Sequence, residues 1–270
     1  MVQYSAPQPG VDLQHEQKKP GRTSGSASLM ETYNEYFYYR IARTPDDINQ
    51  AYRLRYQVYC EETGFLPKEE HPDGLESDAC DAHSVQSVLY YRPLGLPAGT
   101  VRVVRPNPDA EGCGLPARIA APGLDLLPEK ILPCARTGEI SRFSIHAGFR
   151  KRQSDGLYAA VHDPRQGGGD PRRILPHMTL GLMTSIFEIS LETDLTHLCA
   201  IIDPALLRML RMLGLRFEAV GPLVEFHGPR QPVFAPVRQL IEGVKRDFPE
   251  VHDVITAGGR LQLDGRHAAA

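Results

Sequence analysis

Glu139-Ile-Ser-Arg-Phe-Ser-Ile145 is the stretch of this sequence that decides the fold. Alternation along a strand assigns its side chains to two faces, with Glu139, Ser141 and Phe143 on one and Ile140, Arg142 and Ser144 on the other. Two other unusual segments precede it, Arg55-Tyr-Gln-Val-Tyr-Cys-Glu-Glu-Thr-Gly-Phe65 and Glu76-Ser-Asp-Ala-Cys-Asp-Ala-His83. Together the three segments predict one composite polar site rather than scattered surface charges.

The composition is that of a globular protein, since 41% of the 270 residues are hydrophobic and 23% are charged. A net charge of −3 argues against a dedicated nucleic-acid-binding protein. No stretch reaches the ~18 apolar residues that span a bilayer, so we expect no integral membrane segment. Residues 1–28 lack the apolar centre of a signal peptide, which predicts a cytoplasmic protein.

The cysteines are odd in number and include no C-x-x-C pair. They are Cys60, Cys80, Cys113, Cys134 and Cys199. This pattern favours neither a structural metal site nor a disulfide framework. Cys60 and Cys80 lie in the unusual segments and are nucleophiles in principle, but we expect all five to be reduced packing residues.

Strand-like and helix-like patterns interleave along the chain. Strands are predicted at 38–42, 84–91, 99–105, 139–145, 196–202, 216–220 and 223–227, and helices at 45–59, 174–191, 205–213 and 233–248. Segment 106–133 is expected to be mostly loop with one short helix. This order predicts a single α/β domain over 31–250, with a disordered tail at 1–30, a flexible insertion around 153–173 and a C-terminal tail at 251–270.

The motifs resemble those of the acyl-homoserine-lactone synthases and N-acyl amino acid synthases, a branch of the GNAT acyltransferases. The matching positions are Arg55, Tyr59, Phe65, Asp78, Asp81, Gly99, Arg102, Glu139, Ser141, Arg142 and Phe143. The lactone synthases usually have Trp where this chain has Phe65, and the sequence contains no Trp.

A closer resemblance is to the acyltransferase associated with the PEP-CTERM/exosortase protein-sorting system. It is carried by R-Y-x-V-Y-C-x-E-x-G-F from Arg55, D-x-H-S from Asp81, E-I-S-R from Glu139, and F-H-G-P-R-Q-P from Phe226. The combination is specific, although each motif alone is weak.

The resemblance implies a GNAT-like mixed sheet that is mostly antiparallel, has a bulged or splayed central strand and is flanked by helices. It implies an N-acyltransferase that moves a fatty acyl group from a thioester of acyl carrier protein, or of CoA, to the amine of an amino acid or similar small acceptor. No tightly bound cofactor is expected, and peripheral contact with a lipid product is compatible with this chemistry. The alternatives are an acyl-homoserine-lactone synthase and a non-catalytic GNAT-like sensor of acyl carrier or lipid.

The catalytic candidates are Glu139, Arg142 and Ser144. A carboxylate near the attacking amine can act as its base, and partial burial on a central strand raises a carboxyl pKa. The alternative for Glu139 is an ion pair with a nearby arginine. The oxyanion donor is expected in the backbone of 143–145, around Ser144, and Arg142 is expected to organise the site or bind a carboxylate.

The substrate-binding candidates are Arg55, Tyr59, Phe65, Asp78, Asp81, Arg102 and Phe143. Asp81 is expected to hold Arg55 and Arg102 through charge-assisted hydrogen bonds, whereas Asp78 is open between that role and binding a substrate ammonium. Arg102 can grip a carboxylate with its planar fork, and an internal ion pair is its alternative. His83 and His227 are interpreted as structural.

The segment after residue 148 departs from the phosphate-binding loop of CoA-using GNAT enzymes. Arg152 or Gln153, with Gly156, offers half of that loop before a Gly-rich insertion interrupts it. A basic group there favours an acidic acyl carrier protein as partner, with a solvated basic loop as the alternative. The proposed carrier-docking residues are Arg150, Lys151, Arg152, Arg172 and Arg173.

Overall fold

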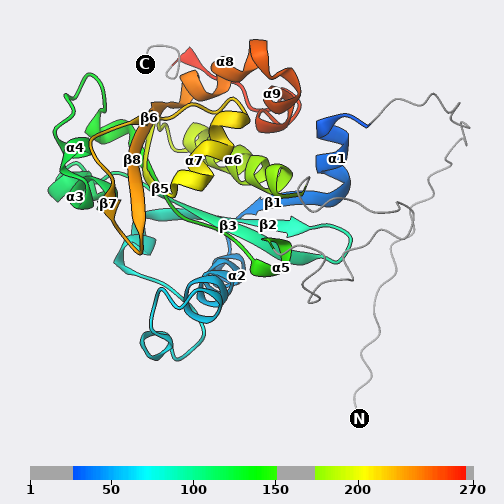
Figure 1. The fold of residues 1–270 in the computed structure, drawn as a ribbon, viewed down its shortest axis with the longest axis horizontal. Coiled ribbons are helices and arrows are strands. Elements are labelled where there is room, and N and C mark those ends of the chain that lie inside the picture. The colour runs from blue at the N-terminus through cyan, green and yellow to red at the C-terminus, as the bar shows by residue number, and fades with distance from the viewer. Residues whose placement is uncertain (1–26, 151–173, 266–270) are drawn as a thin grey trace, which may run out of the picture.

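The structure is a computed structural model that describes residues 27–150 and 174–265 of the chain. An 8-stranded sheet runs through it in the order β1-β2-β3-β4-β5-β8-β6, and β7 pairs with β8. Helices lie on both sides of the sheet, with α6 on one side and α2 on the other (Figure 1). The mixed, mostly antiparallel α/β fold predicted from the sequence is therefore confirmed.

The first half of the sheet is antiparallel. It consists of β1 (Phe37–Ile41), β2 (Ser84–Tyr91), β3 (Leu96–Val104) and β4 (Thr137–Ile145). Helix α1 (Leu29–Tyr36) precedes β1, and α2 (Pro45–Tyr56) follows it. Thr44 and Asp47 form a capping box at the start of α2, which confirms the predicted helix start. The helix continues as a π-helical stretch over Gln57–Glu62.

The second half of the sheet begins with β5 (His197–Ile202), which is parallel to β4. Strand β8 (Pro229–Pro236) pairs with β5, and β6 (Glu218–Ala219) and β7 (Val224–Glu225) pair with β8. The helices of this half are α6 (Ile174–Glu192), α7 (Pro204–Met212), α8 (Val237–Asp247) and α9 (Pro249–Ile255).

Short helical turns make up most of the connections near the site. They are Lys68–Glu70, Ala79–His83, Glu111–Gly114, α3 (Pro116–Ala120), α4 (Pro122–Asp125), Cys134–Arg136 and α5 (Ala147–Arg150). Segment 106–133 therefore contains more helix than the one short helix predicted.

The central strand β4 is both splayed and bulged, as predicted. It pairs with β5 only over Thr137 to Glu139, opposite His197 to Cys199, and beyond these residues both strands line one cavity. On its other side, Ser144 faces Thr100 and Ser141 faces Arg102, so β4 has two residues where β3 has one. Arg142, one of these two, has a left-handed φ of 51°.

The bulge corrects the predicted alternation beyond Ser141. Ile140 lies in the main core, opposite the face of Ser141, as predicted. Arg142, however, joins the polar side chains beside Ser141, and Phe143 packs against the main core instead. The extra residue shifts the two-residue period by one, so every later side chain changes face.

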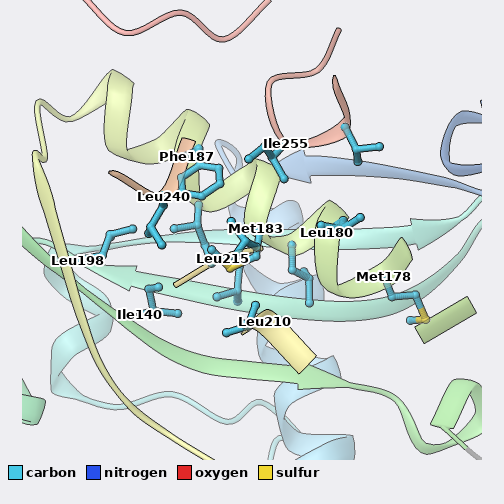
Figure 2. Packing of buried hydrophobic residues seen from close by; sticks show 14 of the residues in the cluster. Ile140, Met178, Leu180, Met183, Phe187, Leu198, Leu210, Leu215, Leu240 and Ile255 are labelled. Carbon is cyan, nitrogen blue, oxygen red and sulfur yellow. The ribbon is translucent and has the colours of Figure 1, made fainter. Parts of the chain in front are cut away.

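The main hydrophobic core lies between α6 and the sheet (Figure 2). Phe187, Leu180 and Met183 of α6 belong to this core together with Ile140 of β4 and Leu198 of β5. On the opposite face, α2 covers one end of the sheet, and α3 and α4 cover the other end over Val104, Cys199 and Phe234. Of the helices in the described ranges, none combines the length and apolar character needed to cross a bilayer.

Several boundaries differ from the sequence-based predictions. Residues 233–236 belong to β8, so the helix predicted from 233 begins at Val237. The predicted C-terminal tail contains α9, whose Val251, Val254 and Ile255 are buried in the main core. Helix α1 begins inside the predicted N-terminal tail, and the predicted insertion at 153–173 lies outside the described residues.

Cys113 and Cys134 form a disulfide, with their Cα atoms 5.7 Å apart. The expectation that all five cysteines are reduced is therefore wrong, although Cys60, Cys80 and Cys199 are free. An odd count argues against complete pairing, but it does not exclude one bridge. Folding of the β3–β4 connection brings the two thiols together from 21 residues apart in the sequence.

Candidate functional site

A cavity of about 730 Å³ opens where β4 and β5 part. Polar side chains line one part of it, and they are Asp78, Arg102, Glu139, Ser141 and Arg142. Apolar side chains from α6, α7 and the segment before β6 line another part, and they include Leu175, Met183, Leu206, Leu210 and Phe217. This volume suits a small-molecule site, and the lining offers both an ionic region and an apolar slot.

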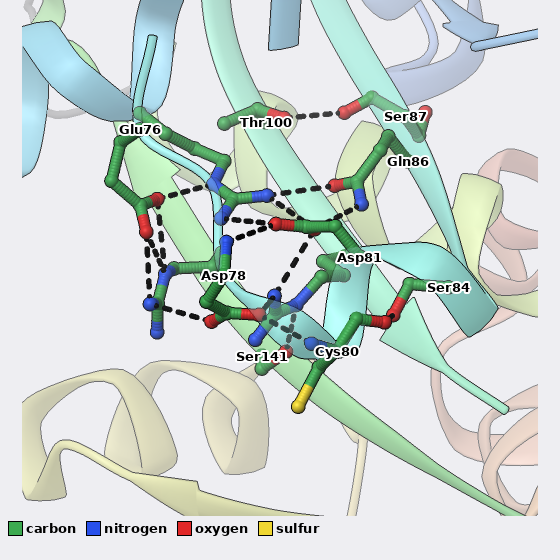
Figure 3. A network of polar contacts seen from close by, with 12 residues as sticks. Glu76, Asp78, Cys80, Asp81, Ser84, Gln86, Ser87, Thr100 and Ser141 are labelled. Atoms are coloured by element: carbon green, nitrogen blue, oxygen red, sulfur yellow. Dashed lines mark hydrogen bonds and ion pairs between the residues drawn. The ribbon is translucent and has the colours of Figure 1, made fainter. Parts of the chain in front are cut away.

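A network of arginines and acids forms the polar wall (Figure 3). Arg55 of α2 is 0% exposed, and its guanidinium donates to Glu76 at 2.5 Å and to Asp81 at 2.7 and 3.1 Å. Arg102 of β3 donates to Asp78 at 2.6 Å, to Asp81 at 3.1 Å and to the Ser141 hydroxyl at 2.9 Å. The predicted contact of Asp81 with both arginines is confirmed.

Arg142 closes the network from the bulge. Its guanidinium donates to Glu76 and to Asp78, each at 2.9 Å, and lies 5.5 Å from the centroid of the Tyr59 ring. Three guanidinium groups thus share three carboxylates, so the formal charge of the network cancels.

The arginines keep these carboxylates ionised. Burial opposes ionisation of Glu76, but hydrogen bonds from Arg55 and Arg142 outweigh it and lower the pKa. Burial acts in the same way on Asp81, and the guanidinium of Arg55 and the charge of Arg102 bring its pKa down to about 2. The network is therefore fully charged at neutral pH.

Glu139 behaves in the opposite way. It is 6% exposed and accepts a 2.7 Å hydrogen bond from the backbone N–H of Ala117. Burial raises its pKa to about 7, against the smaller lowering effects of this hydrogen bond and of the charges on Arg102 and Arg142. In the described part of the chain, no arginine forms an ion pair with Glu139, so the alternative role considered for it belongs instead to Glu76.

Ser144 and its neighbours lie where a backbone donor was predicted. Ser144 is buried, faces Thr100 across the sheet and lines the cavity with Phe143 and Ile145. The bulge removes one-to-one pairing with β3 over residues 142–143, and pairing with β5 ends at Glu139. Backbone groups of this stretch, whose residues line the cavity, therefore have fewer ladder partners than those of an ordinary central strand.

Two aromatic side chains stand at the rim of the cavity. Phe65 is 38% exposed and stacks on the His227 ring, with ring centroids 5.2 Å apart. His227 lies in the β7–β8 connection, where Arg230 donates to its carbonyl oxygen at 3.0 Å and to Asp203 at 3.0 Å. The F-H-G-P-R motif thus builds part of the cavity wall, and His227 has a place there that the sequence did not indicate.

The structure separates the predicted residues by location. Tyr59, Phe65, Asp78, Arg102 and Phe143 line the cavity, together with the three catalytic candidates. Arg55 and Asp81 support that wall through the buried network. Lys151, Arg152, Arg172 and Arg173 lie outside the described residues, and Arg150 is described only as the backbone end of α5.

Sequence reasoning missed Glu76 and Ala117. Glu76 is 1% exposed and bridges Arg55 and Arg142, and its one sequence signal is its position two residues before Asp78. Ala117 acts only through its backbone N–H, which no residue pattern reveals.

Comparison with known proteins agrees with this fold. The family model of the acetyltransferase (GNAT) domain matches residues 54–159. No curated protein matches the chain in sequence.

Similar solved structures include two lactone synthases and one amino acid synthase. The AHL synthase LasI is 18% identical with a TM-score of 0.51, over 77% of this chain and 96% of LasI. The CoA-dependent acyl-homoserine lactone synthase BjaI, solved with SAM and isopentyl-CoA, is 18% identical with a TM-score of 0.51, over 87% of this chain and 97% of BjaI. FeeM, an N-acyl amino acid synthase from uncultured soil microbes, is 20% identical with a TM-score of 0.50, over 78% of this chain and 96% of FeeM. At such identities the likeness establishes the GNAT-like fold.

Proposed function

We propose that this GNAT-fold chain is an N-acyltransferase that moves a fatty acyl group from a thioester to the amine of an amino acid or similar small acceptor. One observation carries the proposal: a single cavity holds a buried carboxyl group with a pKa of about 7 beside an apolar slot. Acyl transfer to an amine needs a base that is half-ionised near neutral pH and a dry place for the acyl chain. The GNAT domain match and the synthases among the similar structures support the same reaction class.

Glu139 is the base in this proposal. Its carboxylate takes a proton from the acceptor ammonium, directly or through a water, and the neutral amine attacks the thioester carbonyl carbon. The C–N bond forms and the C–S bond breaks. The departing sulfur receives the proton held by Glu139, and the second proton that the nitrogen loses on becoming an amide goes to water. Backbone N–H groups around Ser144 stabilise the negative oxygen that forms between these steps.

The ionic wall orients the acceptor. Asp78 and Arg142 keep 32% and 20% of their side chains exposed, so both can meet a ligand while they remain in the network. Asp78 suits the ammonium, and Arg142, with Arg102 behind it, suits the carboxylate of an amino acid. Arg55 and Asp81 act by holding these groups, while Tyr59, Phe65 and Phe143 provide apolar contacts.

The donor is proposed to be acyl carrier protein rather than CoA. The basic residues of 150–152 and 172–173 and the incomplete phosphate loop support this choice, whereas BjaI is a CoA-dependent relative in fold. The motifs from Arg55 to Pro232 support membership of the PEP-CTERM/exosortase-associated acyltransferases. We propose that the protein works in the cytoplasm and contacts lipid peripherally when the product is released.

Mass spectrometry of products tests the proposal. Purified protein is incubated with acyl carrier protein or CoA thioesters of several chain lengths and a panel of amino acids. We expect N-acyl amino acids and an equal amount of released thiol. Glu139→Gln should lower turnover by about 100-fold or more, the usual contribution of a general base, and the exposed Glu69→Gln should leave it unchanged.

Other outcomes would overturn the proposal. Glu139→Gln with wild-type turnover would remove the base. Release of methylthioadenosine from S-adenosylmethionine would identify a lactone synthase, despite Phe65 in place of Trp. Tight binding of the acyl donor without any transfer, by folded wild-type protein, would identify a sensor.

A further inference from the structure

The connection between β3 and β4 forms a wall of the cavity. Pro116, Ala117 and Ala120 line the cavity, and the Ala117 N–H donates to Glu139. The disulfide joins Cys113, just before α3, to Cys134, just before β4. It thereby closes this wall into a loop, and Ala117 near the start of that loop contacts the proposed base.

The wall excludes water from Glu139. Leu115, Ala117, Leu124 and Leu132 of this connection are at most 1% exposed and pack over Cys199 of β5. The turn that leads into α3 has Cys113 itself in the left-handed region, at a φ of 57°. A non-glycine residue keeps that conformation only where its surroundings hold it, and the cross-link supplies such a constraint.

We propose that the Cys113–Cys134 disulfide positions Glu139 by holding the α3 wall against β4, and that thiol reductants release this wall. The inference rests on the proposed function and adds a regulator of the same site. Reduction breaks the S–S bond, each cysteine sulfur gains a proton, and two reductant thiols become one disulfide, so two electrons pass to the protein.

The bridge is placed where a reductant can reach it. Both cysteines are partly exposed, unlike Cys60 and Cys199. The Arg118 guanidinium lies 2.9 Å from the Cys113 sulfur. A neighbouring guanidinium stabilises a thiolate, which makes Cys113 the better leaving group when the bridge is attacked.

The charged groups around Glu139 determine how release of the wall changes the pKa of this residue. Asp78 and Cys80 face it from the segment before β2, Arg102 from β3, Arg142 from its own strand and Cys199 from β5. None of these groups lies on the α3 wall, which contributes the Ala117 N–H and part of the cover over Glu139. Release therefore weakens the burial that raises the pKa of Glu139 and leaves the neighbouring charges in place.

The test compares pH profiles of kcat/KM for oxidised and reduced protein. Wild type is assayed with and without a dithiol reductant, with thiol counting to prove cleavage and circular dichroism to prove that the fold persists. We expect the acidic limb of the reduced protein to move to lower pH by about one unit, because water reaches Glu139. The plateau should fall by roughly tenfold as the base loses its fixed position.

Two variants sharpen this test. The double variant C113S/C134S should behave like reduced wild type and should not respond to the reductant, which makes it the matched control for effects on the free cysteines. Ala117→Pro removes the N–H donor in the first helical turn, where proline is tolerated, and adds ring atoms to the buried wall. Because that donor lowers the pKa of Glu139, this variant should move the acidic limb to higher pH, opposite to reduction.

An unchanged profile after complete reduction of folded, active wild type would overturn the inference alone. Absence of N-acyl product from both oxidised and reduced protein would instead overturn the proposed function. The two failures are thus distinguishable.

Discussion

Glu76 and Glu139 show how differently two buried glutamates can be used within one site. Glu76 lies between Arg55 and Arg142, and these guanidinium groups hold its pKa low against the effect of burial. Glu139 has one neutral backbone donor, and burial raises its pKa to about 7. The partners of each carboxyl group, rather than its residue type, make one a fixed charge and the other a titrating group.

Glu139→Gln is predicted to stabilise the folded protein at alkaline pH. The raised pKa means that folded protein holds a proton which the unfolded chain releases, so stability is lost as the pH rises from about 4.5 to about 7. The neutral Gln avoids this loss, which is on the order of 3 kcal/mol for a shift of this size. Urea unfolding should therefore show a more stable variant at pH 8 and nearly equal proteins at pH 4.5. A variant that is less stable than wild type at pH 8 would contradict the assignment of the raised pKa.

Glu76→Gln is predicted to destabilise the protein at pH 7 by about 3 kcal/mol. The substitution removes the negative charge that pairs with the buried guanidinium of Arg55 and the half-buried guanidinium of Arg142. The lowered pKa of Glu76 gives the sign: its contribution is present above about pH 4.5 and is lost as the pH falls below that value. Urea unfolding from pH 7 to pH 3 should show the gap to wild type narrowing. Glu69→Gln, at an exposed position, is the control and should match wild type throughout.

At the scale of elements, the α7 helix ends at a glycine that the sequence marks and the structure explains. Gly214 has a φ of 85°, and an added Cβ would lie 2.4 Å from the ring of Phe248, the residue between α8 and α9. Gly214→Ala therefore meets both backbone strain and a collision between elements.

This substitution is predicted to lower the free energy of unfolding by about 2 kcal/mol. Gly64→Ala isolates the backbone effect, because its φ is also positive but nothing lies within 4 Å. Gly243→Ala, on α8 with open space around it, should instead stabilise by about 0.5–1 kcal/mol. Chemical denaturation of the three variants checks this order, and equal values for Gly214→Ala and Gly64→Ala would show that α7 and Phe248 are not tightly packed.

Elements with signals in their own sequence could be predicted, whereas a strand that forms only by pairing with distant strands could not. Thr44, as the N-cap of a capping box, and Pro45, in the first turn, predict the start of α2. Strand β8 carries Pro229, Pro232 and Pro236, which argue against a strand in sequence, yet it pairs with β5, β6 and β7. Tertiary hydrogen bonding outweighed the local pattern there, and the same strand supplies Arg230 to the cavity rim.

For the molecule as a whole, the sequence indicated which side chains form the ionic network but not which carboxylate pairs with which arginine. The three arginines, Asp78 and Asp81 were identifiable by type and motif, whereas the use of Glu76 in place of Glu139 as ion-pair partner depends on the β4 bulge. The α3 wall and the Cys113–Cys134 bridge come from a connection without periodicity, so only the folded chain reveals them.

The short junction between β4 and β5 also has a mechanical consequence. Three residue pairs join the antiparallel sheet of β1 to β4 with the sheet of β5 to β8, while each half is paired along most of its own strands. Within the sheet, a load applied across the strands would therefore concentrate on this seam. The proposed chemistry thus takes place beside the shortest strand pairing between the two halves of the sheet. A fatty acyl chain can enter there without unfolding either half.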